Sequence, residues 1–242
     1  MYKNWKDVCL FSQTTGFHNK YFLFLFIKSY ICDIKLNMNK EEHWQQVFNT
    51  RQANEVSWYQ PTPLESLDFV KQLAIPAEAA IIDVGGGDSL FVDHLLQLGY
   101  KNITVLDISA TAINKSKQRL GEKASAVNWI VADVLQLNSV EQYDCWHDRA
   151  AFHFFTTATE IDKYLSVAQK HISPKGRLII GTFSSAGPQK CSGLPVKQYS
   201  ENMLTSTLQK WFFKIRCITT DHVTPLKTIQ QFLFCSFKKI TL

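Results

Sequence analysis

Short apolar runs alternate with amphipathic segments through the middle of the chain. The apolar runs predict strands at 80–84, 102–107, 127–132, 142–147 and 177–183. The segments between them predict helices at 89–98, 110–120 and 159–170, with Gly99 and Gly121 as stop signals and Ser109 as an N-cap. Alternating strands and helices of this kind predict a doubly wound α/β fold, whose parallel sheet carries helices on both faces.

The two ends of this pattern differ from its middle. Helices are predicted at 39–49 and 63–74 on one side, and near 200–210 on the other. Two aromatic-rich strands, 211–220 and 230–237, then follow with no room for a normal helix between them. Strands joined without a crossover pair antiparallel, so a closing hairpin is predicted on a mostly parallel seven-stranded sheet.

A glycine-rich turn follows the first strand and contains Gly85, Gly86 and Gly87. The next strand ends in a single acid, Asp107, 20 residues past Gly87. Glycines let a ligand approach the backbone, and a carboxylate accepts hydrogen bonds from ribose hydroxyls. The pattern therefore predicts a nucleotide site at the carboxyl edge of the sheet. Leu90 stands where a dinucleotide fingerprint has its third glycine, which argues against NAD.

Three acids at successive strand ends narrow the nucleotide further. Asp83, Gly85 and Gly87 form D-x-G-x-G, and Asp107 and Asp133 end the next two strands. This arrangement resembles the class I S-adenosylmethionine (SAM) methyltransferases over about residues 43–237. The segments Trp146–Phe154 (WHDRAAFHF) and Lys190–Ser200 resemble a generic bacterial subgroup of that family. The resemblance implies SAM as cofactor and the strand order 3-2-1-4-5-7-6.

The resemblance also implies a role for each cofactor-site residue. Asp107 would accept the ribose hydroxyls, and Asp83 would lie near the methionyl ammonium. Asp133 and Val134 would contact the adenine, on which Ile108 would pack. The backbone at Gly85, Gly86 and Gly87 would approach the methionyl part and the ribose. Structural alternatives exist for these residues. They are helix caps for Asp107 and Asp133, simple surface exposure for Asp83, core packing for Ile108, and an ordinary strand–helix turn for the glycines.

Methyl transfer from SAM is an in-line displacement, which needs alignment and a base only if the nucleophile arrives protonated. His147, Asp148, Arg149 and His153 follow the fourth strand, where the acceptor would meet the methyl group. We take His153 and Asp148 as the catalytic candidates. The alternatives are an Asp148–Arg149 ion pair and a core histidine at 153, because aromatic neighbours disfavour a charged imidazolium.

Two segments are candidates for covering the site. Trp44, Trp58 and Tyr59 fall in the N-terminal helical region, which often forms a lid in this family; aromatic core packing is equally compatible. The loop 184–195 follows the fifth strand and is expected to flank the acceptor pocket, since loops of this length are often functional.

Composition excludes several classes of partner. The net charge is +5, of which residues 1–37 hold +3, so the remaining body gives no electrostatic case for nucleic acid. Six cysteines form no C-x-x-C pair, and seven histidines show no ligand spacing. These counts predict a reducing, cytoplasmic environment, no disulfide framework and no metal site.

The chain divides into an extension, 1–37, and a methyltransferase domain, 38–242. The apolar run Tyr21–Ile27 is too short to span a bilayer, which needs about 20 residues, so no stable membrane insertion is predicted. Met38 stands just before the family resemblance begins, which suggests a mis-called start or a disordered extension. A peripheral membrane or partner-binding segment is the alternative.

Three functions remain compatible with the sequence. The first is a SAM-dependent methyltransferase with a small-molecule acceptor. The second is a seven-strand protein-lysine methyltransferase, suggested by Trp44 and Trp58–Tyr59, although Asp148–Arg149–Ala150 replaces the acidic-glycine motif usual there. The third is a nucleotide-binding module without methyl transfer.

Overall fold

The computed structural model describes residues 40–240. The chain divides into two units at residue 44, and the described part of the first unit, 40–43, is helical. The expected extension 1–37 and the alternative start at Met38 lie outside the described residues.

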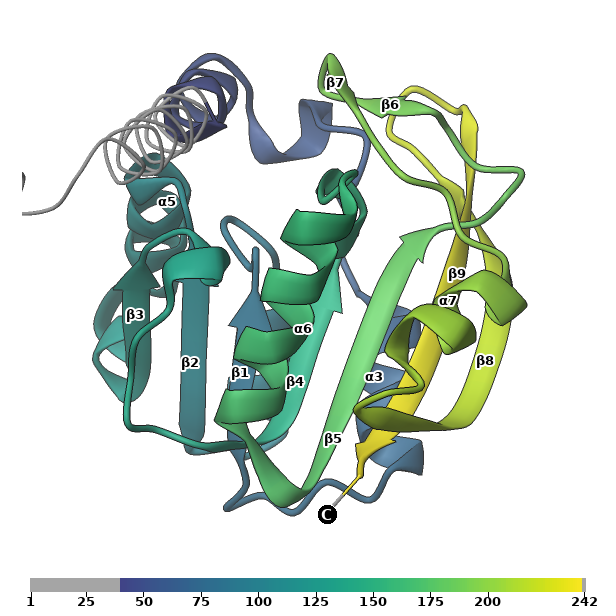
Figure 1. Ribbon diagram of the computed structural model, residues 1–242. Helices are drawn as coiled ribbons and strands as arrows, with labels where there is room; N and C mark the ends of the chain where they lie inside the picture. Colours follow the sequence, from purple (N-terminus) through teal and green to yellow (C-terminus); the bar gives the residue numbers. More distant parts are fainter. Residues whose placement is uncertain (1–39, 241–242) are drawn as a thin grey trace, which may run out of the picture. The chain divides into compact units, whose positions relative to one another are not determined.

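A seven-stranded sheet organises the second unit (Figure 1). Its strands lie in the order β3-β2-β1-β4-β5-β9-β8. The bounds are β1 Ala80–Val84, β2 Asn102–Asp107, β3 Val127–Val131, β4 Tyr143–Arg149, β5 Ile172–Phe183, β8 Phe212–Val223 and β9 Ile229–Lys239. The first five strands pair parallel, whereas β9 pairs antiparallel with both β5 and β8. The predicted fold and strand order are confirmed, with β9 and β8 as the closing hairpin.

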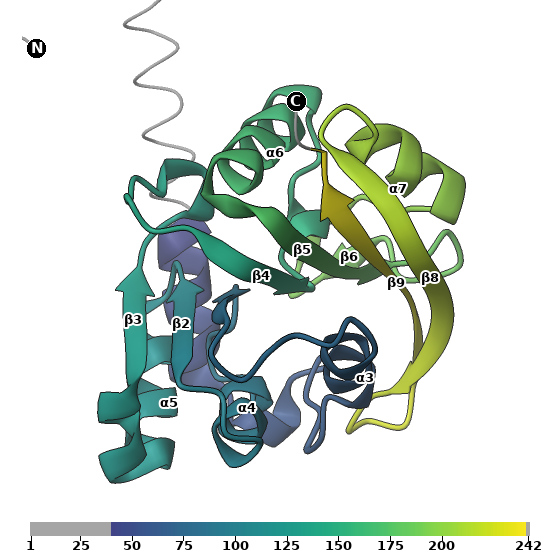
Figure 2. The same cartoon turned by 90° about the horizontal axis from the view of Figure 1, so that it is seen from below.

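Helices cover both faces of the sheet, as Figure 2 shows. One face carries α3 Leu64–Gln72, α4 Phe91–Gln97 and α5 Ala110–Leu120, and the other carries α6 Ala158–His171 and α7 Glu201–Leu208. Residues 44–50 are also helical. Short 3-10 turns complete the chain: η1 Ala53–Glu55, η2 Gly121–Ala126, η3 Val134–Gln136 and η4 Phe152–Phe154.

The central strands are apolar because both of their faces are buried. In β1, Ile81 packs among side chains of α3 and α4, while Ile82 packs in the separate core that includes α6 and α7. Both isoleucines are fully buried. Local signals fix the helix starts, since the Ser109 hydroxyl accepts a hydrogen bond from the Ala112 N–H at 3.2 Å and Thr157 forms a capping box with Glu160.

The segment after β5 is less irregular than expected. The predicted loop 184–195 contains a small antiparallel hairpin, formed by β6 Lys190–Cys191 and β7 Leu194–Pro195. The backbone of Ser184 also bridges to Tyr199, which joins the chain just before this hairpin to the chain just after it.

The closing hairpin carries a disulfide, which corrects one prediction. Cys217 of β8 and Cys235 of β9 are direct partners in the strand register and are joined by a disulfide bond. The prediction of no disulfide is therefore wrong for this pair. The sequence separation of 18 residues does not indicate a disulfide bond, because only the register of the two strands places the two thiols opposite each other. Cys145 and Cys191 are free and buried.

Residues 40–240 contain neither a helix suited to crossing a membrane nor a side-chain cluster suited to holding a metal ion. No helix in this range has the length and apolar character needed to cross a membrane. No group of three or more His, Cys, Asp or Glu side chains in the same range is arranged to hold a metal ion.

Candidate active site

The glycine turn after β1 is fastened to the end of β2. The N–H groups of Gly85 and Gly86 both donate to the Leu106 carbonyl, at 2.8 and 3.3 Å. Gly85 and Gly87 have φ values of +67° and +39°, a region that other residues rarely adopt. The conformation of this turn therefore requires glycine at both positions.

Close packing gives a second reason for the three glycines. A Cβ on Gly86 would lie 2.5 Å from Asp83 Oδ2, and one on Gly87 would lie 2.7 Å from Asp107 Oδ2. A Cβ on Gly85 would meet the Ala151 side chain at 2.7 Å. The turn is therefore a narrow cradle between two carboxylates, with no room for any side chain of its own.

Helix α5 holds the far side of the same turn. The Ser116 hydroxyl donates to the Gly87 carbonyl at 2.7 Å. Arg119 Nη2 donates to the Ser89 carbonyl at 2.8 Å and pairs with Asp93 at the same distance. Arg119 also contacts the Asp88 carboxylate. These contacts keep residues 87–89 fixed relative to the sheet.

Asp107 is buried at the end of β2 with 5% of its surface exposed. Its Oδ1 accepts from the Ser109 N–H at 2.7 Å, and a further hydrogen bond comes from the Gly87 backbone. Burial raises the pKa of Asp107 to about 7, and the neighbouring Asp83 charge acts in the same direction. A ligand that donates hydrogen bonds to this carboxylate would stabilise its ionised form.

Asp83 forms a buried hydrogen-bonded chain with two side chains from other elements. Its Oδ1 lies 2.7 Å from His147 Nδ1, and His147 Nε2 lies 2.8 Å from the Ser66 hydroxyl. All three residues are at most 2% exposed. Asp83 Oδ2 is also buried and has no hydrogen-bond partner within residues 40–240. His147 therefore supports Asp83 from within the core and does not line the expected acceptor position.

The third predicted acid lies beside the other two. The Ala132 N–H donates to the Asp107 carbonyl at 3.0 Å, which joins the ends of β2 and β3. Asp133 caps η3, where its Oδ1 accepts from the Leu135 N–H at 2.9 Å. Val134 is buried, and Ile108 is half-buried next to Asp107. The structure thus brings all the predicted cofactor-site residues to one edge of the sheet.

Asp148 is fully buried on the opposite side of β4 from His147. Its Oδ1 accepts from the N–H groups of Ala151 and Phe152, each at 3.0 Å, and its Oδ2 accepts from the Tyr164 hydroxyl at 2.7 Å. Burial raises the pKa of Asp148 to about 6. The alternative of an Asp148–Arg149 ion pair is wrong, because these contacts turn the carboxylate toward α6.

His153 is packed inside an aromatic cluster. Its ring stacks on Phe183 with centroids 4.4 Å apart, and its Nδ1 lies 3.4 Å from the Phe183 N–H. The side chain is fully buried. Burial, reinforced by the charge of Arg149, lowers the pKa of His153 to about 3. This environment stabilises a neutral imidazole and disfavours proton uptake.

An aromatic cover from the N-terminal segment lies over the glycine turn. Trp44 packs edge-on against Trp58 and Phe154, with centroids 5.9 and 5.1 Å apart. The Phe48 ring comes within 3.4 Å of where a Gly87 Cβ would stand. The sequence indicated Trp44 and Trp58 but not Phe48, although the spacing of four from Trp44 to Phe48 is a recognisable helical signal.

Gln45 is a second residue near the site that the sequence analysis did not predict. Its Oε1 accepts from the Ser109 hydroxyl and from the Thr111 N–H, each at 3.0 Å. The helical residues 44–50 are thereby tied to the start of α5, directly after Asp107.

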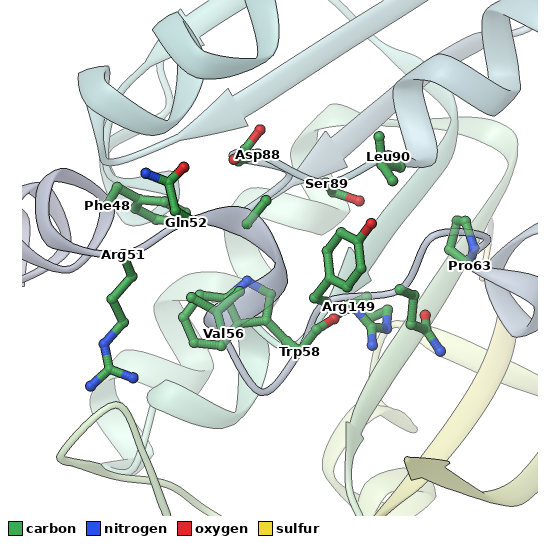
Figure 3. A pocket seen from close by; sticks show the side chains of 13 residues that line it. Phe48, Arg51, Gln52, Val56, Trp58, Pro63, Asp88, Ser89, Leu90 and Arg149 are labelled. Carbon is green, nitrogen blue, oxygen red and sulfur yellow. Dashed lines mark hydrogen bonds between the residues drawn. The ribbon is translucent and has the colours of Figure 1, made fainter. Parts of the chain in front are cut away.

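A pocket opens between this cover and the glycine turn (Figure 3). Its walls come from three places: the segment 48–63, the residues after the glycines, and the end of β4. The lining residues are Phe48, Arg51, Gln52, Ala53, Val56, Trp58, Tyr59, Gln60, Pro63, Asp88, Ser89, Leu90 and Arg149.

Known proteins share part of this sequence and most of this fold. Residues 81–176, about two fifths of the chain, match the family model described as a methyltransferase domain. The structure of the Burkholderia thailandensis 1,6-didemethyltoxoflavin-N1-methyltransferase, with bound 1,6-didemethyltoxoflavin and S-adenosylhomocysteine, is similar with a TM-score of 0.62. The aligned region covers 88% of this chain and 90% of the Burkholderia chain, with 19% sequence identity. The fold is that of the SAM-dependent methyltransferases, as expected.

Curated relatives match over shorter stretches. The mouse (Mus musculus) eEF1A lysine and N-terminal methyltransferase is 28% identical over 96 residues, which is 40% of this chain and 14% of that protein. The malonyl-[acyl-carrier protein] O-methyltransferase of Anoxybacillus flavithermus is 28% identical over 117 residues, 48% of this chain and 42% of that protein. The matches thus span less than half the length of either relative, and the acceptors in their names differ.

Proposed function

We propose that this protein transfers a methyl group from SAM to a small-molecule acceptor. The observation that carries the proposal is the cradle at Gly85–Gly87, bounded by the buried carboxylates of Asp83 and Asp107. A site with two carboxylates and no cationic side chain in its cradle suits the ammonium and hydroxyl groups of SAM better than the pyrophosphate of NAD.

The side chains present fit the cofactor. Asp107 would accept hydrogen bonds from the ribose hydroxyls, and the unpartnered Oδ2 of Asp83 would receive the methionyl ammonium directly or through water. Asp133 and Val134 would hold the adenine, with Ile108 beside it. The Gly85–Gly87 backbone would hold the methionyl part and the ribose. Bound SAM supplies a methyl group already activated by its sulfonium.

The two catalytic candidates have environments that favour a structural role. Within the described residues, the Asp148 carboxylate accepts its hydrogen bonds from Ala151, Phe152 and Tyr164. A histidine with a pKa of about 3 is a poor proton acceptor near neutral pH. We infer that the protein mainly aligns the reactants and excludes water during the transfer. The acceptor atom then arrives unprotonated, or releases its proton to solvent after the methyl group has been transferred.

Two observations support a small-molecule acceptor. The solved Burkholderia N1-methyltransferase has 1,6-didemethyltoxoflavin bound, and the pocket here is lined in part by the rings of Phe48, Trp58 and Tyr59. Protein-lysine methylation is the second candidate, because the mouse eEF1A enzyme is among the relatives. The assignment to the bacterial subgroup rests on the segments Trp146–Phe154 and Lys190–Ser200 and belongs to this proposal.

Calorimetry on the purified protein tests the cofactor assignment. Binding of SAM and S-adenosylhomocysteine is expected, and binding of NAD is not. NAD binding without a response to SAM would refute the proposal. Tritiated SAM added with the protein to a cell extract then separates the two acceptor classes. Label in the small-molecule fraction is expected, and label confined to protein would favour the lysine alternative.

A further inference from the structure

Arg149 is a half-buried cation that ends β4 and lines the pocket beside Trp58 (Figure 3). It forms no salt bridge within the described part of the chain. Burial lowers its pKa to about 10, and the charges of Glu65 and Asp83 act on it in the opposite direction without touching it. A cation with buried nitrogen atoms and no direct ion-pair partner is costly to keep, which makes Arg149 a candidate for a functional role.

One nitrogen of the Arg149 guanidinium donates a hydrogen bond within the protein, and the other two have no hydrogen-bond partner among residues 40–240. Nη1 donates to the Trp58 carbonyl at 3.0 Å, and the guanidinium carbon lies 5.4 Å from the centre of the Phe232 ring. Nε and Nη2 are both buried and have no hydrogen-bond partner within residues 40–240. These two nitrogens point their N–H groups in the same direction, which is the edge that grips a carboxylate with two parallel hydrogen bonds.

The backbone beside Arg149 is also unusual. Ala150 has a φ of +67°, a left-handed conformation that is costly for a residue with a Cβ. Its N–H donates to the Gly181 carbonyl at 2.8 Å, which holds this turn against β5. Strain of this kind is concentrated at binding and catalytic sites.

We propose that Arg149 is a ligand-binding residue, whose Nε–Nη2 edge holds a carboxylate of the molecule that fills the pocket. This inference rests on the proposed function and refines it by naming the chemistry of the ligand. The carboxylate comes from one of two sources, the methionyl end of SAM or the methyl acceptor. Because the edge is buried beneath Trp58, ligand entry displaces the segment 51–60, in which η1 is the only helix or strand.

Three variants distinguish carboxylate binding by the Nε–Nη2 edge from a general effect of the positive charge. Arg149→Met removes the cation, Arg149→Lys keeps the charge but not the two-pronged edge, and Arg177→Met is the matched control. Arg177 is also half-buried and lies on the neighbouring strand β5, but it does not line the pocket. A merely structural arginine would make Arg149→Met unstable. We expect this variant to retain or raise the melting temperature of the free protein, because it removes a half-buried charge that has no salt bridge within residues 40–240.

Calorimetry with matched probes identifies the source of the carboxylate. S-adenosylhomocysteine carries the methionyl carboxylate, and methylthioadenosine lacks it. If the cofactor supplies the group, Arg149→Met weakens S-adenosylhomocysteine binding by roughly 10- to 150-fold and leaves methylthioadenosine binding unchanged. If the acceptor supplies it, both affinities stay the same, and binding of benzoate to the cofactor complex is lost, with benzamide as the neutral control.

The same titrations show whether Arg149 binds no carboxylate at all. Equal S-adenosylhomocysteine affinity in both proteins, together with no benzoate binding that depends on Arg149, would overturn it. Benzoate is also titrated into the free protein, so the inference is judged even if the wild type binds no cofactor. A wild-type protein that binds no cofactor would refute the proposed function, independently of the result for Arg149.

Discussion

Asp83 and His147 lie side by side on β1 and β4, with Oδ1 and Nδ1 2.7 Å apart and both side chains almost fully buried. The Ser66 hydroxyl of α3 contacts the other ring nitrogen at 2.8 Å. The acid expected to meet the cofactor is thus positioned by a histidine in the core, which is in turn held by a helix outside the sheet.

His147→Leu is expected to lower the free energy of unfolding by about 3–5 kcal/mol, because it leaves the Asp83 carboxylate buried without its donor. Ser66→Ala should cost only about 1 kcal/mol. Urea denaturation measures both. The double variant Asp83→Asn/His147→Leu serves as control and should recover part of the loss, since no buried charge remains. Additive losses would show that the two side chains are not coupled.

Asp107→Ala is expected to weaken S-adenosylhomocysteine binding by about 1–3 kcal/mol, since two buried ribose hydroxyls lose their acceptor. Isothermal calorimetry gives the affinity. Asp162→Ala, an exposed carboxylate on α6, is the matched control and should bind like the wild type. Unchanged affinity in Asp107→Ala would mean that the ribose does not lie at the end of β2.

The raised pKa of Asp107 predicts a pH dependence of stability. Its pKa is 3.8 in the unfolded reference and about 7 in the fold, so the folded state binds the proton more tightly. The corresponding stability is complete below the unfolded pKa and is lost as the pH rises through about 7. The stability of the wild type relative to Asp107→Asn should therefore decline over this range. A flat or rising difference in thermal unfolding experiments would contradict the shift.

His153→Asn tests whether this histidine is a base. Burial against Phe183 and a pKa of about 3 predict a structural role, so stability should fall by about 1–3 kcal/mol. The folded fraction should keep near-normal turnover once an acceptor is known. A loss of about 10²–10⁴-fold in kcat with intact SAM affinity would instead identify a general base.

The Cys217–Cys235 bond predicts both a thiol count and a stability difference. Protein denatured without reductant should show the same number of reactive thiols in the wild type and in the double variant Cys217→Ser/Cys235→Ser. Loss of the cross-link should lower the free energy of unfolding by about 3 kcal/mol for a loop of this length. Two additional thiols in the wild type would show that the pair is reduced under the conditions used.

Local patterns were sufficient to place most elements. The strand at 80–84, the helix at 110–120 with its Ser109 cap, and the final antiparallel hairpin follow from periodicity, capping and the absence of a crossover helix. The carboxyl edges of parallel strands coincide, so three acids at strand ends also predicted a shared site. These features depend on near neighbours in the sequence, and the sequence by itself determined them.

Side-chain partners across the fold were decided only by the tertiary structure. Adjacent residues of a strand face opposite sides of the sheet, so His147 reaches Asp83, Asp148 reaches Tyr164, and Arg149 reaches the carbonyl of Trp58. Strand register, not spacing, brought Cys217 to Cys235. Burial, which sets the charge of His153 and leaves one edge of Arg149 unpaired, arises when several elements pack together. No local pattern encodes such distances, because each depends on elements that are far apart in the chain.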